Sequence, residues 1–168
     1  MWYNIVIIES EDKIMDEHIK KVSDSATEQC YIVMPKDANG SGRLFGGRLL
    51  EWMDLAAAIT ARRHAGREVT TAAIDSISFK APAHVGDTVV IGARVTYVGR
   101  TSMEIRTEAY VESLDGERSL INTAYFILIA LDKNEKPCPV PRIIPETEQE
   151  RADYNAAAER KQLRKKST

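Results

Sequence analysis

The fold of this chain is decided by residues 39–64, NGSGRLFGGRLLEWMDLAAAITARRH, where a glycine-rich turn leads into a helical pattern. When the residues from Gly46 onward are placed on a helix at 100° per residue, apolar side chains cover one face and most of the opposite side. They are Leu49, Leu50, Met53, Ala57 and Ala61 on one face, and Trp52, Leu55 and Ile59 on the other. A helix that is apolar on nearly all sides is buried, so the pattern predicts a central helix that other elements surround.

Asp54 is the one acidic side chain that lies off the narrow polar line of this helix, among small and apolar neighbours. A carboxylate in such surroundings costs free energy unless it is paired or hydrogen-bonded. Carboxylates in this setting often serve as catalytic bases or nucleophiles. The helix alone leaves a second interpretation open, in which Asp54 caps a backbone group or pairs with an arginine of a neighbouring strand.

Gly46 and Gly47 open the helix and leave its first N–H groups uncovered by any Cβ. Such a helix start can stabilise an anion or an oxyanion. A Gly-Gly step by itself is usually only a turn. Asp54, however, follows about two helical turns later, roughly 11 Å along the axis, a span that one acyl group and its partners can bridge.

Five segments have the composition and periodicity of β-strands, at residues 27–34, 69–79, 88–98, 102–112 and 120–131. Residues 102–112 alternate most regularly, which predicts one buried and one solvated face. Residues 120–131 are almost continuously apolar, which predicts the centre of the sheet. One strand, one helix and four strands predict an α+β fold, a five-stranded antiparallel sheet around one long helix. An exposed sheet edge and an uncovered helix flank would favour an oligomer.

The two ends of the chain are expected to lie outside this unit, which spans residues 27–145. Residues 1–26 are interpreted as a loosely structured extension, helical from about residue 12 to 22. In residues 146–168, Thr147 and Glu150 form a capping box, which predicts a C-terminal surface helix. The basic end of this helix is expected to be solvated, with a phosphate-binding arm as the alternative.

Composition limits the partners. The chain has 168 residues, enough for one domain, and its net charge of −2 gives no reason to expect nucleic acid. Its two cysteines, Cys30 and Cys138, are far apart and lack metal-ligand spacing, so neither a disulfide framework nor a metal site is expected. The apolar run at residues 5–8 is too short to span a membrane or direct export, so we expect a cytoplasmic protein.

Several motifs in the same order resemble the hotdog-fold acyl-CoA thioesterases of the cytosolic acyl-CoA hydrolase type. The resemblance covers about residues 30–148. The motifs that carry it are Asp37-Ala38-Asn39, Gly42, Leu44-Phe45-Gly46-Gly47, Trp52-Met53-Asp54, Asp75-Ser76, Phe79, Pro82, Val85-Gly86-Asp87 and Gly99-Arg100-Thr101-Ser102.

The resemblance implies hydrolysis of fatty acyl-CoA to a free fatty acid and coenzyme A, without a cofactor. It also implies a dimer with two sites across its interface, commonly assembled as a hexameric trimer of dimers. The family's catalytic acid falls on Asp54 and its active-site asparagine on Asn39, contributed by different subunits. Arg100, Thr101 and Ser102 match the hairpin that lies against coenzyme A in relatives.

Each of these residues can be given a chemical role. The Gly47 amide, beside that of Gly46, is assigned as the oxyanion donor, and Asp54 acts as general base or as nucleophile. Asn39 can both accept from and donate to one water and would orient it, unless it is only a loop residue in a left-handed conformation.

The remaining candidates concern phosphate binding and charge. Arg100 suits a phosphate, with hydroxyl donors from Thr101 and Ser102, although it can also be a solvated hairpin tip. Lys80 is a second phosphate candidate. His64 ends the helix, where a cation suits the dipole, and is expected to be a structural or surface residue.

Two other functions are compatible with this fold. A non-catalytic acyl-CoA or lipid-binding module would need no reactive carboxylate and would normally bring a DNA-binding segment. A hydratase would need an aspartate and a histidine on one loop, and this chain has no such pair.

Overall fold

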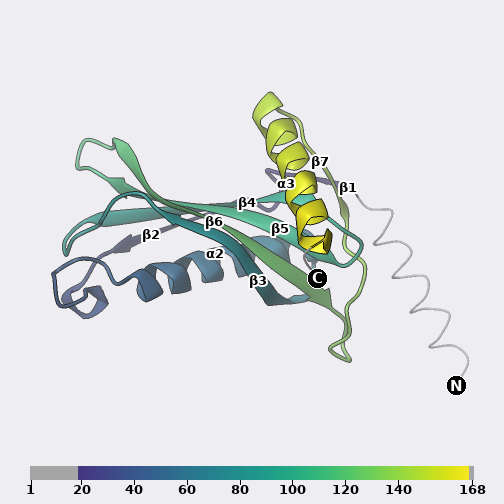
Figure 1. Cartoon of the computed structure of the whole chain (residues 1–168), viewed down its shortest axis with the longest axis horizontal. Helices are drawn as coiled ribbons and strands as arrows, with labels where there is room; N and C mark the ends of the chain where they lie inside the picture. The colour runs from purple at the N-terminus through teal and green to yellow at the C-terminus, as the bar shows by residue number, and fades with distance from the viewer. Residues whose placement is uncertain (1–18, 167–168) are drawn as a thin grey trace, which may run out of the picture.

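The computed structural model describes the backbone of residues 19–166 and the side chains of residues 19–164. A five-stranded antiparallel sheet has the strand order β2-β4-β5-β6-β3, with helix α2 on one face and helix α3 on the other (Figure 1). The predicted hotdog architecture is therefore confirmed. The elements are β2 (Thr27–Ile32), the short 3₁₀ helix η1 (Pro35–Asp37), α2 (Gly46–Ala65), β3 (Glu68–Phe79), β4 (Thr88–Val98), β5 (Ser102–Glu112), β6 (Arg118–Leu131) and α3 (Glu148–Lys166).

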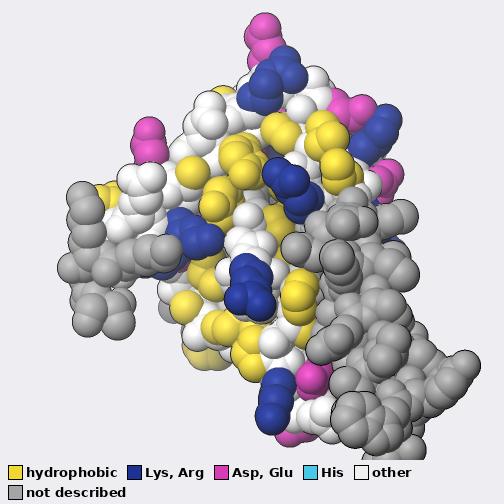
Figure 2. All heavy atoms as spheres, turned by 90° about the vertical axis from the view of Figure 1, so that its right-hand side faces the viewer, with side chains coloured by type: hydrophobic (Ala, Val, Ile, Leu, Met, Phe, Trp, Pro, Cys, Tyr) yellow, Lys and Arg dark blue, Asp and Glu magenta, His cyan; other side chains and the backbone are white. Residues whose placement is uncertain are grey.

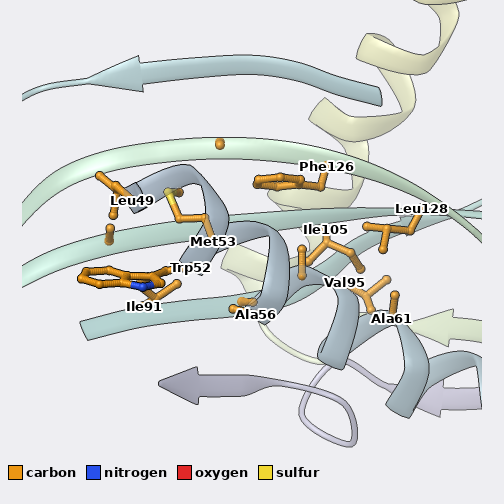
Figure 3. Packing of buried hydrophobic residues seen from close by; sticks show 14 of the residues in the cluster. Leu49, Trp52, Met53, Ala56, Ala61, Ile91, Val95, Ile105, Phe126 and Leu128 are labelled. Carbon is orange, nitrogen blue, oxygen red and sulfur yellow. The ribbon is translucent and has the colours of Figure 1, made fainter. Parts of the chain in front are cut away.

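The core lies between α2 and the face of the sheet that curls around it. Figure 3 shows Leu49, Trp52 and Met53 of the helix packed among side chains of β4, β5 and β6. Alanines occupy the other sheet-facing positions of α2 and let it approach the strands closely. They are Ala56, Ala57, Ala61 and Ala65, none of which is exposed. The helix ends at Gly66, whose φ of 63° is the left-handed conformation that glycine adopts readily.

The C-terminal helix is more than the solvated surface helix that its sequence predicts. Its start is as expected, because Thr147 Oγ1 accepts from Glu150 N at 3.1 Å and Glu150 Oε2 accepts from Thr147 N at 3.1 Å. Asp153 is 9% exposed and bonds Arg94 and Arg106 of the sheet at 2.9 and 2.8 Å. Charged residues of β4 and β5 that would otherwise face water therefore fix α3 across the outer face of the sheet.

This packing corrects two expectations about the strands. Glu104, on the side of β5 predicted to be wet, is 2% exposed because Arg160 and Arg164 of α3 cover it. The predicted central position of residues 120–131 is wrong, because β5 is the middle strand and β6 lies between β5 and β3. The outer face of β6 is apolar because α3 also covers it, and the Arg160 guanidinium lies 4.0 Å from the Tyr125 ring centre.

Residues expected to lie in an N-terminal helix include a strand. β1 (Ile19–Lys21) pairs in parallel with β7 (Arg142–Ile144), so the predicted helix is wrong at these positions, and residues 12–18 lie outside the described residues. Lys20 Nζ donates to the carbonyl oxygens of Arg63 and His64 at 2.8 and 2.9 Å. Lys20 therefore supplies the positive charge at the C-terminus of α2.

His64 is a structural residue and does not supply that charge. Its ring is fully buried, and Nε2 lies 2.8 Å from the carbonyl oxygen of Pro141, to which it donates when it carries the proton. Burial lowers the pKa of His64 from its ordinary value, more than the Pro141 hydrogen bond raises it. The neutral ring therefore fits the folded state.

We expect the free energy of unfolding to fall by about 1 kcal/mol between pH 7.5 and pH 5.5 through His64. The unfolded chain binds a proton at this ring as the pH drops below its ordinary pKa near 6.5, whereas the folded chain resists it. Urea titrations at both pH values would measure the change. The His64→Gln variant should lose this part of the pH dependence, and an unchanged difference would contradict the assignment.

No described helix is both long and apolar enough to cross a membrane. Cys30 is exposed and Cys138 is buried, and neither forms a disulfide.

Candidate active site

The first turn of α2 is left uncapped by the rest of the described chain. Phe45, at the N-cap position, makes no side-chain capping bond, and the first turn contains no acidic residue. The N–H groups of Arg48 and Leu49 donate to the Phe45 carbonyl at 2.9 and 3.0 Å. The Gly46 and Gly47 amides have no partner among the described residues, so the positive end of the helix dipole is available to an oxyanion.

Aromatic rings lie close to both glycines, and one of them explains the glycine at position 47. A Cβ at Gly47 would lie 2.6 Å from Cε1 of Phe45, closer than real contacts allow. A Cβ at Gly46 would lie 3.4 Å from the Phe79 ring. Gly47 therefore lets the Phe45 ring lie against the helix start, and its own backbone is exposed.

A cavity of about 330 Å³ opens beside this turn and contains three of the predicted site residues, Asn39, Gly46 and Lys80. Leu49 and Ile121 give it apolar walls. The structure therefore brings a polar side chain, a helix N-terminus and a cation to one hollow with an apolar lining.

The loop before the helix holds Asn39 in place. Its Oδ1 accepts from the N–H groups of Ser41 and Arg43 at 2.9 and 3.3 Å. The alternative of a left-handed Asn39 is wrong, because the only described non-glycine residue with positive φ is Glu135. With Oδ1 engaged in the loop, the Nδ2 group is the part of the amide that remains to act on a ligand or water.

Asp54 is half-buried on the side of α2 that faces β3. Thr71 Oγ1 of β3 donates to its Oδ1 at 2.8 Å. No ion pair involves Asp54 among the described residues, so pairing with an arginine does not explain it. The sequence interpretation missed Thr71, because no motif distinguishes it from Thr70 and the contact exists only once β3 lies beside the helix.

One subunit does not assemble all the predicted residues. Asp54 lies about 12 Å along the helix from Gly46 and does not line the cavity of Asn39. The hairpin with Arg100, Thr101 and Ser102 follows the far end of β4, whose 11 residues span about 36 Å. The hairpin therefore lies at the end of the sheet opposite Asn39 and Gly46, whereas Thr71, which bonds Asp54, lies in the same row of residues as Met103 at the start of β5.

The side of the chain that contains Asp54 is unusually apolar and open. β3 is a 12-residue edge strand, and nearly all of its residues are exposed. Large apolar side chains along β3 and the adjoining flank of α2 are 37 to 59% exposed: Phe45, Leu55, Ile74, Ile77 and Phe79. Such an edge and patch indicate a surface that another chain covers.

Comparison with known proteins identifies the family. Residues 41–116 match the Thioesterase superfamily. A Bacillus subtilis (strain 168) protein named as an uncharacterized acyl-CoA thioester hydrolase is 44% identical over 134 residues, which cover 79% of this chain and 78% of the relative. The chain belongs to the thioesterase superfamily.

Solved structures agree with this membership. An apo-hexameric acyl-CoA thioesterase superimposes on this thioesterase with a TM-score of 0.86 and 42% identity, covering 89% of this chain and 97% of the other. The acyl-CoA hydrolase of Staphylococcus aureus has been solved in complex with butyryl coenzyme A, coenzyme A and coenzyme A disulfide. It superimposes with a TM-score of 0.85 and 35% identity, covering 89% of this chain and 92% of the other. That hydrolase has also been solved with an aspartate, an asparagine or a threonine replaced by alanine.

The described part of this thioesterase has no group of three or more histidine, cysteine, aspartate or glutamate residues that could hold a metal ion.

Proposed function

We propose that this thioesterase hydrolyses fatty acyl-CoA to a free fatty acid and coenzyme A. The observation that carries the proposal is that one chain presents two separate groups of candidate catalytic residues. Asn39 lies beside the uncapped start of α2, and Asp54 is hydrogen-bonded to Thr71 next to an open sheet edge. A non-catalytic binding module would need neither a held carboxylate nor exposed helix amides.

The spacing of the residues substituted in the S. aureus hydrolase supports these assignments. In that protein the asparagine and the aspartate are 15 residues apart, and the threonine follows the aspartate by 17. Asn39, Asp54 and Thr71 have the same order and the same spacing. We therefore assign Thr71 as the residue that orients the Asp54 carboxylate.

The proposed reaction uses few groups. The thioester carbonyl binds with its oxygen toward the Gly47 amide, which stabilises the negative charge that develops there. Asp54 takes a proton from a water that Asn39 orients, the water oxygen bonds to the carbonyl carbon, and the C–S bond then breaks. Alternatively, Asp54 attacks the carbon directly and water cleaves the resulting anhydride. The thiolate leaves readily and needs no strong acid.

The proposed site is completed by a second subunit. The cavity groups Asn39 with the start of α2, and Asp54 lies apart with Thr71 on the apolar edge. Joining two β3 edges would cover the exposed apolar side chains and allow Asp54 of one subunit to face Asn39 of the other. A trimer of such dimers is the assembly we propose, and known structures of relatives are hexameric.

The nucleotide end of coenzyme A is assigned to the hairpin. Arg100 can bind a phosphate, with Thr101 and Ser102 as neutral donors and Lys80 as a separate cation beside the Asn39 cavity. Because the hairpin lies at the end of the sheet opposite Asn39 and the start of α2 of its own subunit, it would serve a site that takes Asn39 from a neighbour. Neither Cys30 nor Cys138 forms a disulfide, which suits the reducing cytoplasm, where we place the activity.

The direct test is thiol release by the purified protein from acyl-CoA substrates of increasing chain length. We expect release from medium- or long-chain acyl-CoA well above the rate without enzyme. A protein that binds acyl-CoA but releases no thiol at any length would be a binding module instead.

A further inference from the structure

A second cavity, of about 410 Å³, lies between the outer face of the sheet and the last turns of α3. Its walls include the Tyr97 ring, Ile127, the Ser102 side chain and the cations Lys161 and Arg164. It lies on the face opposite α2, away from the catalytic candidates. Viewed from the right-hand side of Figure 1, the molecule shows lysine and arginine side chains set among hydrophobic ones (Figure 2).

Lys161 connects α3 to the hairpin assigned to coenzyme A. A Cβ built on Gly99 would lie 2.8 Å from Lys161 Nζ and 2.8 Å from Ser102 Oγ. The ammonium and the hydroxyl therefore lie on the same side of Gly99 and are close to each other. The absence of a side chain at residue 99 is what leaves room for this approach.

The other basic residues near this cavity are engaged with acidic groups. Arg160 bonds Glu104 at 2.7 Å, and Arg164 bonds Asp75 at 2.5 Å. Lys161 has no acidic partner among the described residues, and its Nζ lies 4.7 Å from the Tyr97 ring centre. Its positive charge is thus held in place but not neutralised, which suits an anionic ligand.

We propose that Lys161 binds a phosphate of the nucleotide end of coenzyme A, which makes α3 part of the substrate site. The inference rests on the proposed function and assigns a contact to a helix that the catalytic chemistry does not use. A cation above an aromatic ring, with a hydroxyl and apolar walls beside it, matches a phosphorylated nucleotide, which presents both charge and a flat ring.

The experiment measures coenzyme A binding by calorimetry and hydrolysis of two butyryl thioesters, one of coenzyme A and one of pantetheine, which lacks the nucleotide. For Lys161→Ala we expect about tenfold weaker coenzyme A binding and a similar rise in KM for butyryl-CoA, the range for one lost charge-assisted hydrogen bond. The pantetheine thioester should be hydrolysed as by the wild type. Arg100→Ala should show the same selectivity.

Two further variants distinguish a specific contact of Lys161 with coenzyme A from a general effect of positive surface charge. Lys133→Ala removes one positive charge from the exposed loop after β6, at the same end of the sheet, and should leave binding unchanged. Gly99→Ala keeps every charge but displaces the Lys161 ammonium, so it should weaken coenzyme A binding as Lys161→Ala does.

Equal binding of coenzyme A by Lys161→Ala and wild type would overturn the inference, as would equal losses with both thioesters. Those results leave the proposed function standing if the wild type still releases thiol. Failure of the wild type to hydrolyse either thioester would instead refute the proposed function.

Discussion

The Asp54→Asn variant is expected to lose about 10²- to 10⁴-fold in kcat for acyl-CoA hydrolysis, the usual contribution of a positioned base. Asparagine preserves the size of the side chain and can still accept from Thr71, whose Oγ1 lies 2.8 Å from Asp54 Oδ1. It can neither take the proton from water nor attack the carbonyl. Thiol release under saturating substrate measures the loss, and coenzyme A affinity should stay within about twofold.

Glu51→Gln is the matched control for this experiment. Glu51 lies one turn earlier on the same helix, is exposed and pairs with Arg48 at 2.7 Å, so removing its charge should leave kcat unchanged. Wild-type activity in Asp54→Asn would rule out Asp54 as base or nucleophile. Equal losses of kcat in both variants would mean that activity depends on the total negative charge of the helix and not on the Asp54 carboxylate.

Mixing two inactive variants should restore activity if each site combines Asn39 of one subunit with Asp54 of the other. Asn39→Ala and Asp54→Asn are each expected to be nearly inactive alone. A two-fold mixed dimer has one site with both native residues, so random mixing should recover about a quarter of wild-type activity. Refolding the two variants together and measuring thiol release tests this.

The reverse mixture provides the control. A subunit with both substitutions, paired with a wild-type subunit, spoils both shared sites of the mixed dimer. If Asn39 and Asp54 act within one subunit, the wild-type subunit would keep its activity in this mixture, and the first mixture would recover none. The two mixtures therefore give opposite results for the two arrangements.

The sequence alone determined the central helix and the five strands of the sheet. The 3.6-residue pattern placed the central helix from Gly46 almost to its observed end, and alternation placed β5 at its observed bounds. These patterns are local, because each residue's face follows from its position along its own helix or strand. For the same reason, Thr147 and Glu150 were sufficient to mark the start of α3.

Only the tertiary structure decided what lies against these elements. The hydrogen bond from Thr71 to Asp54, the burial of His64, the covering of Glu104 by α3 and the approach of Lys161 to Gly99 each join segments far apart in the chain. A continuous apolar run likewise showed that β6 is covered on both faces but not which strands flank it. Such contacts depend on strand order and helix docking, which the periodicity of a single segment does not encode.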